Sequence, residues 1–310
     1  MEKESLLKRL SIVKLLYKIG IEQSRQSEST AFLSILSFHN SVEMFLVLVC
    51  ENDPNVKMSG DKNFMSYWEK VPQLSMSSSM RKLNELRNGI KHKGIIPVFQ
   101  EVTDVRLSTT KFLNENSKIF FDVDFQDITL FHLIKFEETR NHLIRGNENL
   151  VKNDLDRCVN EVSNGFYKLL DHYKETKKSE DDKSEFDFIS TIHLDNPSYS
   201  ENMDRKVYDS MKDVILKINQ NFCNVGKALE VLSLGLDYRK FAKFRMLTPS
   251  YVYKDDDGNY IFGDTTKKTV NKDYCQFLID FATDSCLRLQ DFDFSYDPLD
   301  SLNLSDTFPE

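Results

Sequence analysis

One short segment of the chain combines the side chains needed to move a phosphoryl group. The segment RNGIKH contains Arg87, Asn88, Lys91 and His92. In a helix, residues four apart are neighbours, so Arg87 lies over Lys91 and Asn88 over His92. An arginine fork binds phosphate oxygens in pairs, and a histidine transfers protons near neutral pH. The pattern predicts a basic, titratable cluster suited to a phosphate, with further positive charge from Lys93.

Three predicted helices must position this cluster. Apolar residues recur at helical spacing over 2–19 and 31–50. A third helix ends at Gly94, which favours a helix end, and serines 77–79 are expected to cap its start. Its predicted core-facing residues recur every three or four positions and are Met80, Leu83, Leu86 and Ile90.

The helix over 31–50 is the most apolar stretch of the chain. It is long enough to span a bilayer, but His39, Asn40 and Glu43 lie near its middle and are costly in lipid. We expect a buried helix and no membrane. His39 is interpreted as a buried histidine paired with the Glu43 carboxylate four residues on, and Glu43 is equally suited to pair with Arg87.

The segment RNGIKH resembles the signature of the HEPN superfamily of ribonucleases and RNA-binding helical domains. That signature is an arginine, four to six residues, then a histidine, commonly with a polar residue after the arginine, as Asn88 is here. Its place at the end of the third helix of an all-α unit also matches the family. The second helix resembles the family's second helix, with Glu43 at the polar position that faces the site. The resemblance covers about residues 1–120.

The resemblance implies a mainly α fold and cleavage of RNA, either tRNA or mRNA, without metal or cofactor, in a homodimer that joins two motifs. His92 would be the general acid/base, Arg87 would stabilise the phosphoryl charge, and Asn88 would orient His92 or bind the phosphate. Glu43 would hold Arg87 or His92. The expected products carry 2′,3′-cyclic phosphate and 5′-hydroxyl ends. Toxins and defence effectors of this kind also imply an inhibitory or sensor partner protein.

A second function remains open, that of a non-catalytic HEPN-like scaffold or a module that binds RNA or a partner. The net charge is −8, and only five basic side chains group near the motif, at positions 81, 82, 87, 91 and 93. RNA enzymes usually present a wider basic track, so the charge favours this alternative unless two copies combine.

The rest of the chain predicts further domains. Residues 1–176 are expected to form the HEPN-like all-α domain, followed by a charged linker over 177–198. Residues 199–290 form a predicted C-terminal helical domain, with a β-hairpin at 251–263 around Asp257-Gly258. Within it, the predicted core face of a helix comprises Val207, Met211, Val214, Ile215, Ile218, Phe222, Val225, Leu229 and Leu232. The acidic residues 291–310 are expected to be a flexible tail, either a docking motif or an RNA mimic that covers the basic cluster.

Composition agrees with a soluble helical chain. Ten glycines and seven prolines among 310 residues leave few tight turns, which argues against a β-sandwich or barrel. Five cysteines show no metal-type pairing and indicate free thiols in a reducing cytoplasm.

Overall fold

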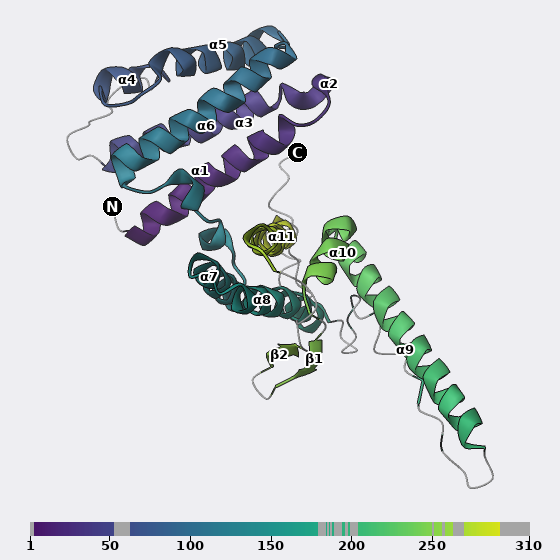
Figure 1. The fold of residues 1–310 in the computed structure, drawn as a ribbon. Helices are drawn as coiled ribbons and strands as arrows, with labels where there is room; N and C mark the ends of the chain where they lie inside the picture. Colours follow the sequence, from purple (N-terminus) through teal and green to yellow (C-terminus); the bar gives the residue numbers. More distant parts are fainter. Residues whose placement is uncertain are drawn as a thin grey trace. The chain divides into compact units, whose positions relative to one another are not determined.

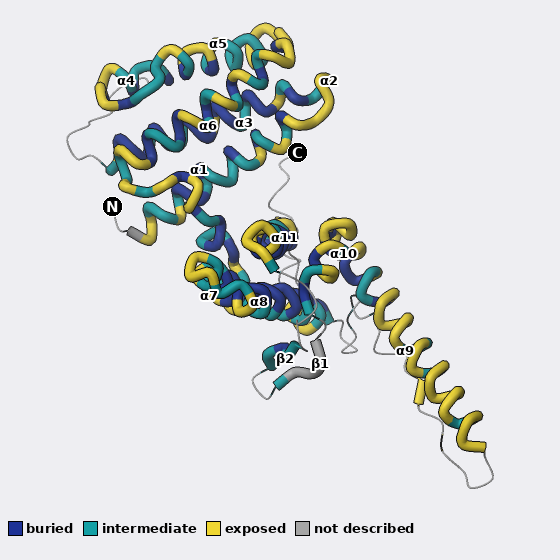
Figure 2. The backbone as a smooth tube through the Cα atoms, viewed as in Figure 1, coloured by how far each residue is buried: buried dark blue, intermediate teal, exposed yellow. Residues whose placement is uncertain are grey.

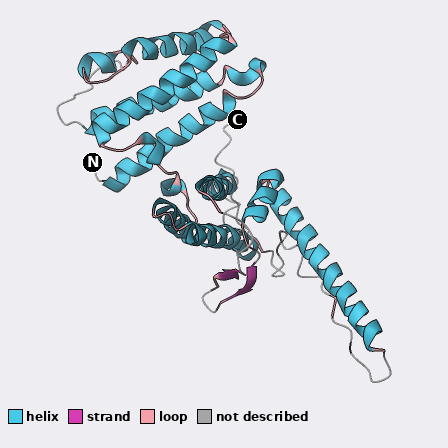
Figure 3. Ribbon diagram, viewed as in Figure 1, coloured by secondary structure: helices cyan, strands magenta, loops and turns pink. Residues whose placement is uncertain are grey.

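The computed structural model describes residues 3–52, 63–178, 204–249, 251–255, 258–262 and 270–291, with single residues at 184, 186, 188, 194, 195 and 198. The fold is mainly α-helical, as predicted (Figures 1 and 3). The chain forms two compact units, Met1–Leu133 (unit 1) and Ile134–Glu310 (unit 2). This division precedes the predicted boundary at 176/177, because the two helices before position 176 pack with later helices.

Unit 1 is built around one apolar helix. Its elements are α1 (Lys3–Gln23), α2 (Glu28–Ala31), α3 (Ser34–Asn52), α4 (Ser66–Lys70), α5 (Ser77–Lys93), α6 (Phe99–Phe121), η1 (Phe125–Asp127) and η2 (Phe131–Leu133). Helix α3 packs against α1, α5 and α6. Phe38, Val42 and Phe45 are fully buried in this core. By length and composition Glu28–Asn52 could cross a bilayer, and 56% of its most apolar window is buried inside the protein.

Helix α5 carries the predicted motif and follows the expected core pattern. Met80 and Leu83 are buried, and Leu86 and Ile90 pack against the same core. The predicted end at Gly94 is confirmed, since this residue has a φ of 63° in the left-handed region that glycine tolerates. The predicted serine cap is wrong. Residues 77–79 form the first turn itself, and Met76 precedes it without a side-chain cap.

Unit 2 is a second helical body with one small sheet. Its elements are α7 (Glu137–Val151), α8 (Leu155–Thr176), α9 (Arg205–Ser233), α10 (Tyr238–Leu247), β1 (Tyr251–Lys254), β2 (Tyr260–Phe262) and α11 (Lys272–Asp291). The predicted hairpin is confirmed as the antiparallel pair β1–β2. Phe166 on α8 packs against the rings of Phe244 and Phe281, with centroids 4.8 and 5.1 Å away. Aromatic side chains from α8, α10 and α11 therefore meet within the core of this unit.

Helix α9 departs from the sequence prediction. Of the nine residues predicted to face a core, Ile215 and Ile218 are half-buried and the other seven are exposed. Figure 2 shows the helix exposed along most of its length. The apolar spacing correctly predicted an amphipathic helix, but not that most of its apolar side would be exposed in the described part of the chain.

Most of two predicted segments lies outside the described residues. They are the linker 177–198, apart from the few positions given above, and the tail 291–310, apart from Asp291. All five cysteines are described and are free thiols, as predicted. Cys50, Cys158, Cys275 and Cys286 are buried, and Cys223 on α9 is exposed.

Candidate functional site

The predicted site residues lie on the last two turns of α5, at the edge of unit 1. Arg87 and Asn88 are half-buried, whereas Lys91, His92 and Lys93 are exposed. The Arg87 guanidinium donates a hydrogen bond of 3.0 Å from Nη1 to Asn88 Oδ1. This contact between sequence neighbours restrains the fork, and no hydrogen bond to another described residue occupies its other N–H groups.

A buried histidine lies beside this row of α5. His39 on α3 is 2% exposed, and its ring stacks on Phe64 with centroids 4.4 Å apart. Its Nε2 lies 3.2 Å from Oδ1 of Asn84 on α5. Because an amide oxygen only accepts, Nε2 carries the proton and Nδ1 is left bare. The expected burial of His39 beside the Glu43 carboxylate is confirmed, and its hydrogen-bond partner is Asn84.

The charges around His39 show which side of α5 faces α3. Burial is the main cause that lowers the pKa of His39 from the usual 6.5. The positive charges of Arg87 and Lys91 lower the pKa further. The hydrogen bond that His39 donates to Asn84 and the charge of the Glu43 carboxylate raise the pKa. The Arg87–Lys91 row therefore lies close enough to α3 to influence this ring.

Glu43 lies beside His39 on α3. Its carboxylate does not contact the residues that the family resemblance suggested. Its Oε2 is 3.8 Å from Nδ1 of His39, the separation set by their i,i+4 spacing on α3. Among the described residues Glu43 makes no ion pair with Arg87 or His92. Its side chain is 45% exposed, so the carboxylate remains open to solvent or a ligand.

His92 stands apart from the other members of the cluster. It is exposed, and the structure gives it no hydrogen bond or ion pair with any described residue. Asn88 is engaged by Arg87, so the amide does not orient the imidazole within a single chain. Among the described residues of the chain, nothing fixes the orientation of the His92 imidazole.

A polar hollow of about 580 Å³ continues along α5 toward its start. Trp68 from α4 and Arg81 and Asn84 from α5 contribute to its wall, together with the carboxylates of Glu69 and Glu85. Its volume falls in the range of small-molecule sites. Asn84 belongs both to this hollow and to the contact with His39, so the hollow begins about one turn from Arg87.

An apolar strip follows the motif directly. Ile95, Ile96, Val98 and Phe99 are all exposed, and Ile96 retains 63% of its accessible surface. Exposed apolar groups that gather in one place commonly mark an interaction surface. The strip connects α5 to α6, so it lies next to the cluster in the sequence and in the fold.

Among the residues that the structure describes, no group of three or more histidine, cysteine, aspartate or glutamate side chains is placed to hold a metal ion. No family model, curated protein or solved structure matches the chain. The relationship to the HEPN superfamily therefore rests on the residues of α5 and their place in the helical unit, and it stays a proposal.

Proposed function

We propose that the protein is a metal-independent endoribonuclease of HEPN type, a cytoplasmic toxin or defence effector acting on tRNA or mRNA. The observation that supports this most is the arrangement at the end of α5. There the Arg87 fork, restrained by Asn88, lies five residues before the exposed His92, about one and a half turns of the helix. These groups can bind a phosphodiester and exchange protons with it.

The chemistry needs two proton transfers. One histidine takes the proton of the ribose 2′-hydroxyl, and the 2′-oxygen attacks phosphorus. The bond from phosphorus to the 5′-oxygen breaks, and that oxygen receives a proton from an acid. The products are a 2′,3′-cyclic phosphate and a 5′-hydroxyl. Arg87 stabilises the charge on the phosphoryl oxygens, and Lys91 and Lys93 attract the RNA backbone.

A homodimer supplies both proton-transfer groups. The cluster on each chain has one exposed histidine, so two copies of His92 would serve as base and acid. The apolar strip Ile95–Phe99 provides surface for such an interface, because burying it removes large aliphatic groups from water. Pairing would also join two basic clusters into the wider track that RNA binding favours.

The polar hollow on α5 supports recognition of a nucleotide next to the cleaved bond. Trp68 offers a ring edge or face to a base, and Arg81 offers a cation to the backbone. Glu69 and Glu85 would repel a phosphate there but can accept hydrogen bonds from an amino group of a base. We therefore assign the base to the hollow and the scissile phosphate to Arg87.

A non-catalytic partner-binding function is the second candidate. The observation that favours it is the exposed apolar face of α9, which catalysis at α5 does not require. In that case the basic cluster would bind RNA or an acidic partner without cutting it.

The decisive experiment measures cleavage of labelled tRNA and unstructured RNA in excess EDTA. Purified wild type is compared with His92→Ala, and His172→Ala provides a matched control because His172 is an exposed histidine on α8. We expect wild type and His172→Ala to cut and His92→Ala to lose at least a hundredfold in rate, the usual size of a lost acid–base group.

Other outcomes are equally clear. Cutting by all three proteins would show that His92 does not act, and would indicate a contaminant or another site. Cutting by none, combined with RNA binding that Arg87→Ala weakens, would support the non-catalytic alternative.

A further inference from the structure

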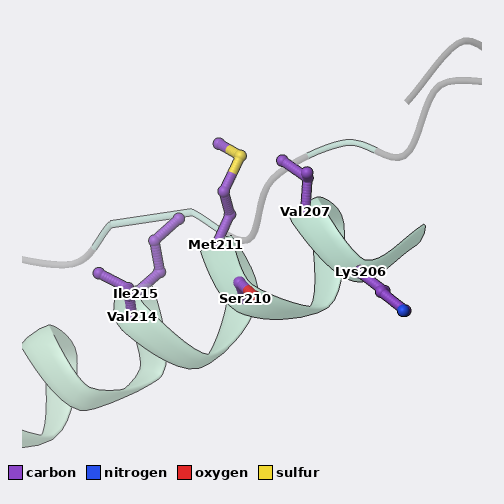
Figure 4. A pocket seen from close by; sticks show the side chains of 6 residues that line it. All are labelled: Lys206, Val207, Ser210, Met211, Val214 and Ile215. Atoms are coloured by element: carbon purple, nitrogen blue, oxygen red, sulfur yellow. The ribbon is translucent and has the colours of Figure 1, made fainter. Parts of the chain in front are cut away.

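Helix α9 presents a continuous apolar stripe that the described part of the fold leaves mostly exposed. The main chain of Leu194 meets its edge through two hydrogen bonds with Asn219. Met211, Ile218, Val225 and Leu232 recur every seven residues along its centre. The side chains beside them are also apolar: Val207, Val214, Ile215, Phe222 and Leu229. The first half of the stripe forms a hollow of about 460 Å³. Figure 4 shows Val207, Met211 and Ile215 projecting to the same side of the helix.

The helix is fixed to unit 2 through its other side. Glu230 is buried and pairs with Lys174 of α8 at 3.4 Å and with Lys227 at 2.8 Å. Gly226 and Val231, near the same end, are buried as well. An amphipathic helix normally buries its apolar face, so one held by an ion pair on the opposite side has its apolar face available for another segment.

Basic residues border the stripe. With 100° between successive residues, Arg205 and Lys212 lie along one edge of its first half and Lys217 along the other. The acidic residues of this half, Asp209 and Asp213, lie farther round the helix. The stripe is therefore suited to a segment that is apolar and negatively charged.

The tail of the same chain has this composition and begins at the right place. Residues 292–310 contain five acidic residues and no lysine or arginine. Their seven large apolar residues are Phe292, Phe294, Tyr296, Leu299, Leu302, Leu304 and Phe308. Helix α11 ends at Asp291, and its Arg288 donates from Nη1 to the Gly235 carbonyl at 2.7 Å, directly after α9. The tail therefore starts beside the C-terminal end of the stripe.

We propose that residues 292–310 bind along the α9 stripe of the same chain, antiparallel to the helix. An extended chain advances about 3.3 Å per residue and a helix 1.5 Å. Leu302 would then lie about 36 Å from Asp291, level with Met211. At this spacing Asp300 would lie level with Lys212 and Lys217, and Asp306 close to Arg205, while the apolar residues from Phe292 to Leu304 would cover the stripe.

A second copy of α9 suits the stripe less well. In a parallel pair, Lys212 and Lys217 of both chains would border the same interface without an acidic partner. In an antiparallel pair they would face the uncharged Asn219, Asn224 and Gly226. Neither arrangement brings an acidic side chain to the basic edges, whereas the tail would bring Asp300 and Asp306 there.

The test places a photoreactive p-benzoylphenylalanine at Leu302 in the full-length chain. A mixture of isotopically heavy and light chains is irradiated, and the crosslinked peptides are identified by mass spectrometry. We expect crosslinks from position 302 to residues 205–218 within one chain. Met211→Asp should lower their yield about tenfold, because a charge replaces an apolar contact.

Leu216→Asp is the matched control. Leu216 is 49% exposed against 43% for Met211, but it lies off the stripe. In Leu216→Asp the crosslink yield should stay within about twofold of the yield without this substitution, the range usual for surface substitutions. Heavy-to-light crosslinks at 205–218 would show that another chain fills the stripe. Crosslinks to α5, or none to α9, would also overturn the proposal, the former in favour of an RNA-mimicking tail.

Discussion

His39 Nε2 on α3 lies 3.2 Å from Asn84 Oδ1 on α5, so a buried polar contact joins the core helix to the helix that carries Arg87 and His92. The two residues are 45 positions apart in the sequence. The side-chain contact therefore ties the end of unit 1 that carries the basic cluster to its most buried helix.

Replacement of Asn84 should destabilise unit 1. Asn84→Leu leaves the buried Nε2–H of His39 without an acceptor, which costs about 1–3 kcal/mol in the free energy of unfolding. Trp68, the only tryptophan, packs against Phe112 in unit 1, so urea unfolding followed by its fluorescence reports on this unit. Asn88→Leu, on the same helix but bonded to Arg87, is the control and should cost less. Equal losses would show that the His39 contact is unimportant.

Stability should fall on acidification because of His39. Burial holds the folded-state pKa below the usual 6.5, so the unfolded chain binds the proton more tightly. Neutral His39 contributes fully to the free energy of unfolding above the pKa that the residue has in the unfolded chain. This contribution is lost as the pH falls from that value toward the lower pKa of the folded state. Unfolding of unit 1 at about pH 7.5 and pH 5 measures this loss. His39→Gln should reduce the pH dependence, whereas His172→Gln should leave it unchanged.

Disruption of the apolar strip should abolish dimer formation and RNA cleavage together. Ile96→Asp introduces a charge where the proposed interface buries an aliphatic side chain, and we expect dissociation constants to rise at least tenfold. Light scattering and the cleavage assay are the measurements. Leu107→Asp on α6 changes an equally exposed residue of the same unit, 62% against 63%, and should affect neither. An active Ile96→Asp monomer would contradict the composite site.

Loss of the Glu230 carboxylate should destabilise unit 2. Glu230→Gln leaves Lys174 and Lys227 largely buried without their counter-charge, a change that typically costs about 3–5 kcal/mol. Glu175→Gln breaks the exposed pair with Lys178 and should cost less than about 1 kcal/mol. Thermal unfolding by circular dichroism compares the two variants. A similar small effect in both would mean that Glu230 does not anchor α9.

The sequence was sufficient to predict most helices, because apolar spacing and helix-ending residues are local signals. Gly94 ends α5 as predicted, and Met80 and Leu83 are buried where the spacing indicated. The contact between His39 and Asn84 was not predicted, because either residue alone is an ordinary polar position on a helix. Their meeting depends on how α3 packs against α5.

Helix α9 shows the opposite limit of sequence patterns. Its apolar residues identify one face of the helix correctly, but periodicity does not show whether that face is covered. The anchoring pair of Glu230 and Lys174 joins two helices far apart in the sequence, so spacing within α9 could not reveal it. The same limit applies to the start of α5, where Met76 adopts a left-handed conformation that serines 77–79 did not indicate.

The exposure of one thiol among five has a practical consequence. A maleimide dye added to the native chain should react at Cys223, and so report from α9 without any engineered cysteine. The same accessibility means that air oxidation can join two chains covalently through α9. Such a disulfide-linked species would have the mass of a dimer even if its Ile95–Phe99 strips were not in contact. Measurements of molecular mass therefore require a reducing agent. Under that condition they report the association through the strips, on which RNA cleavage would depend.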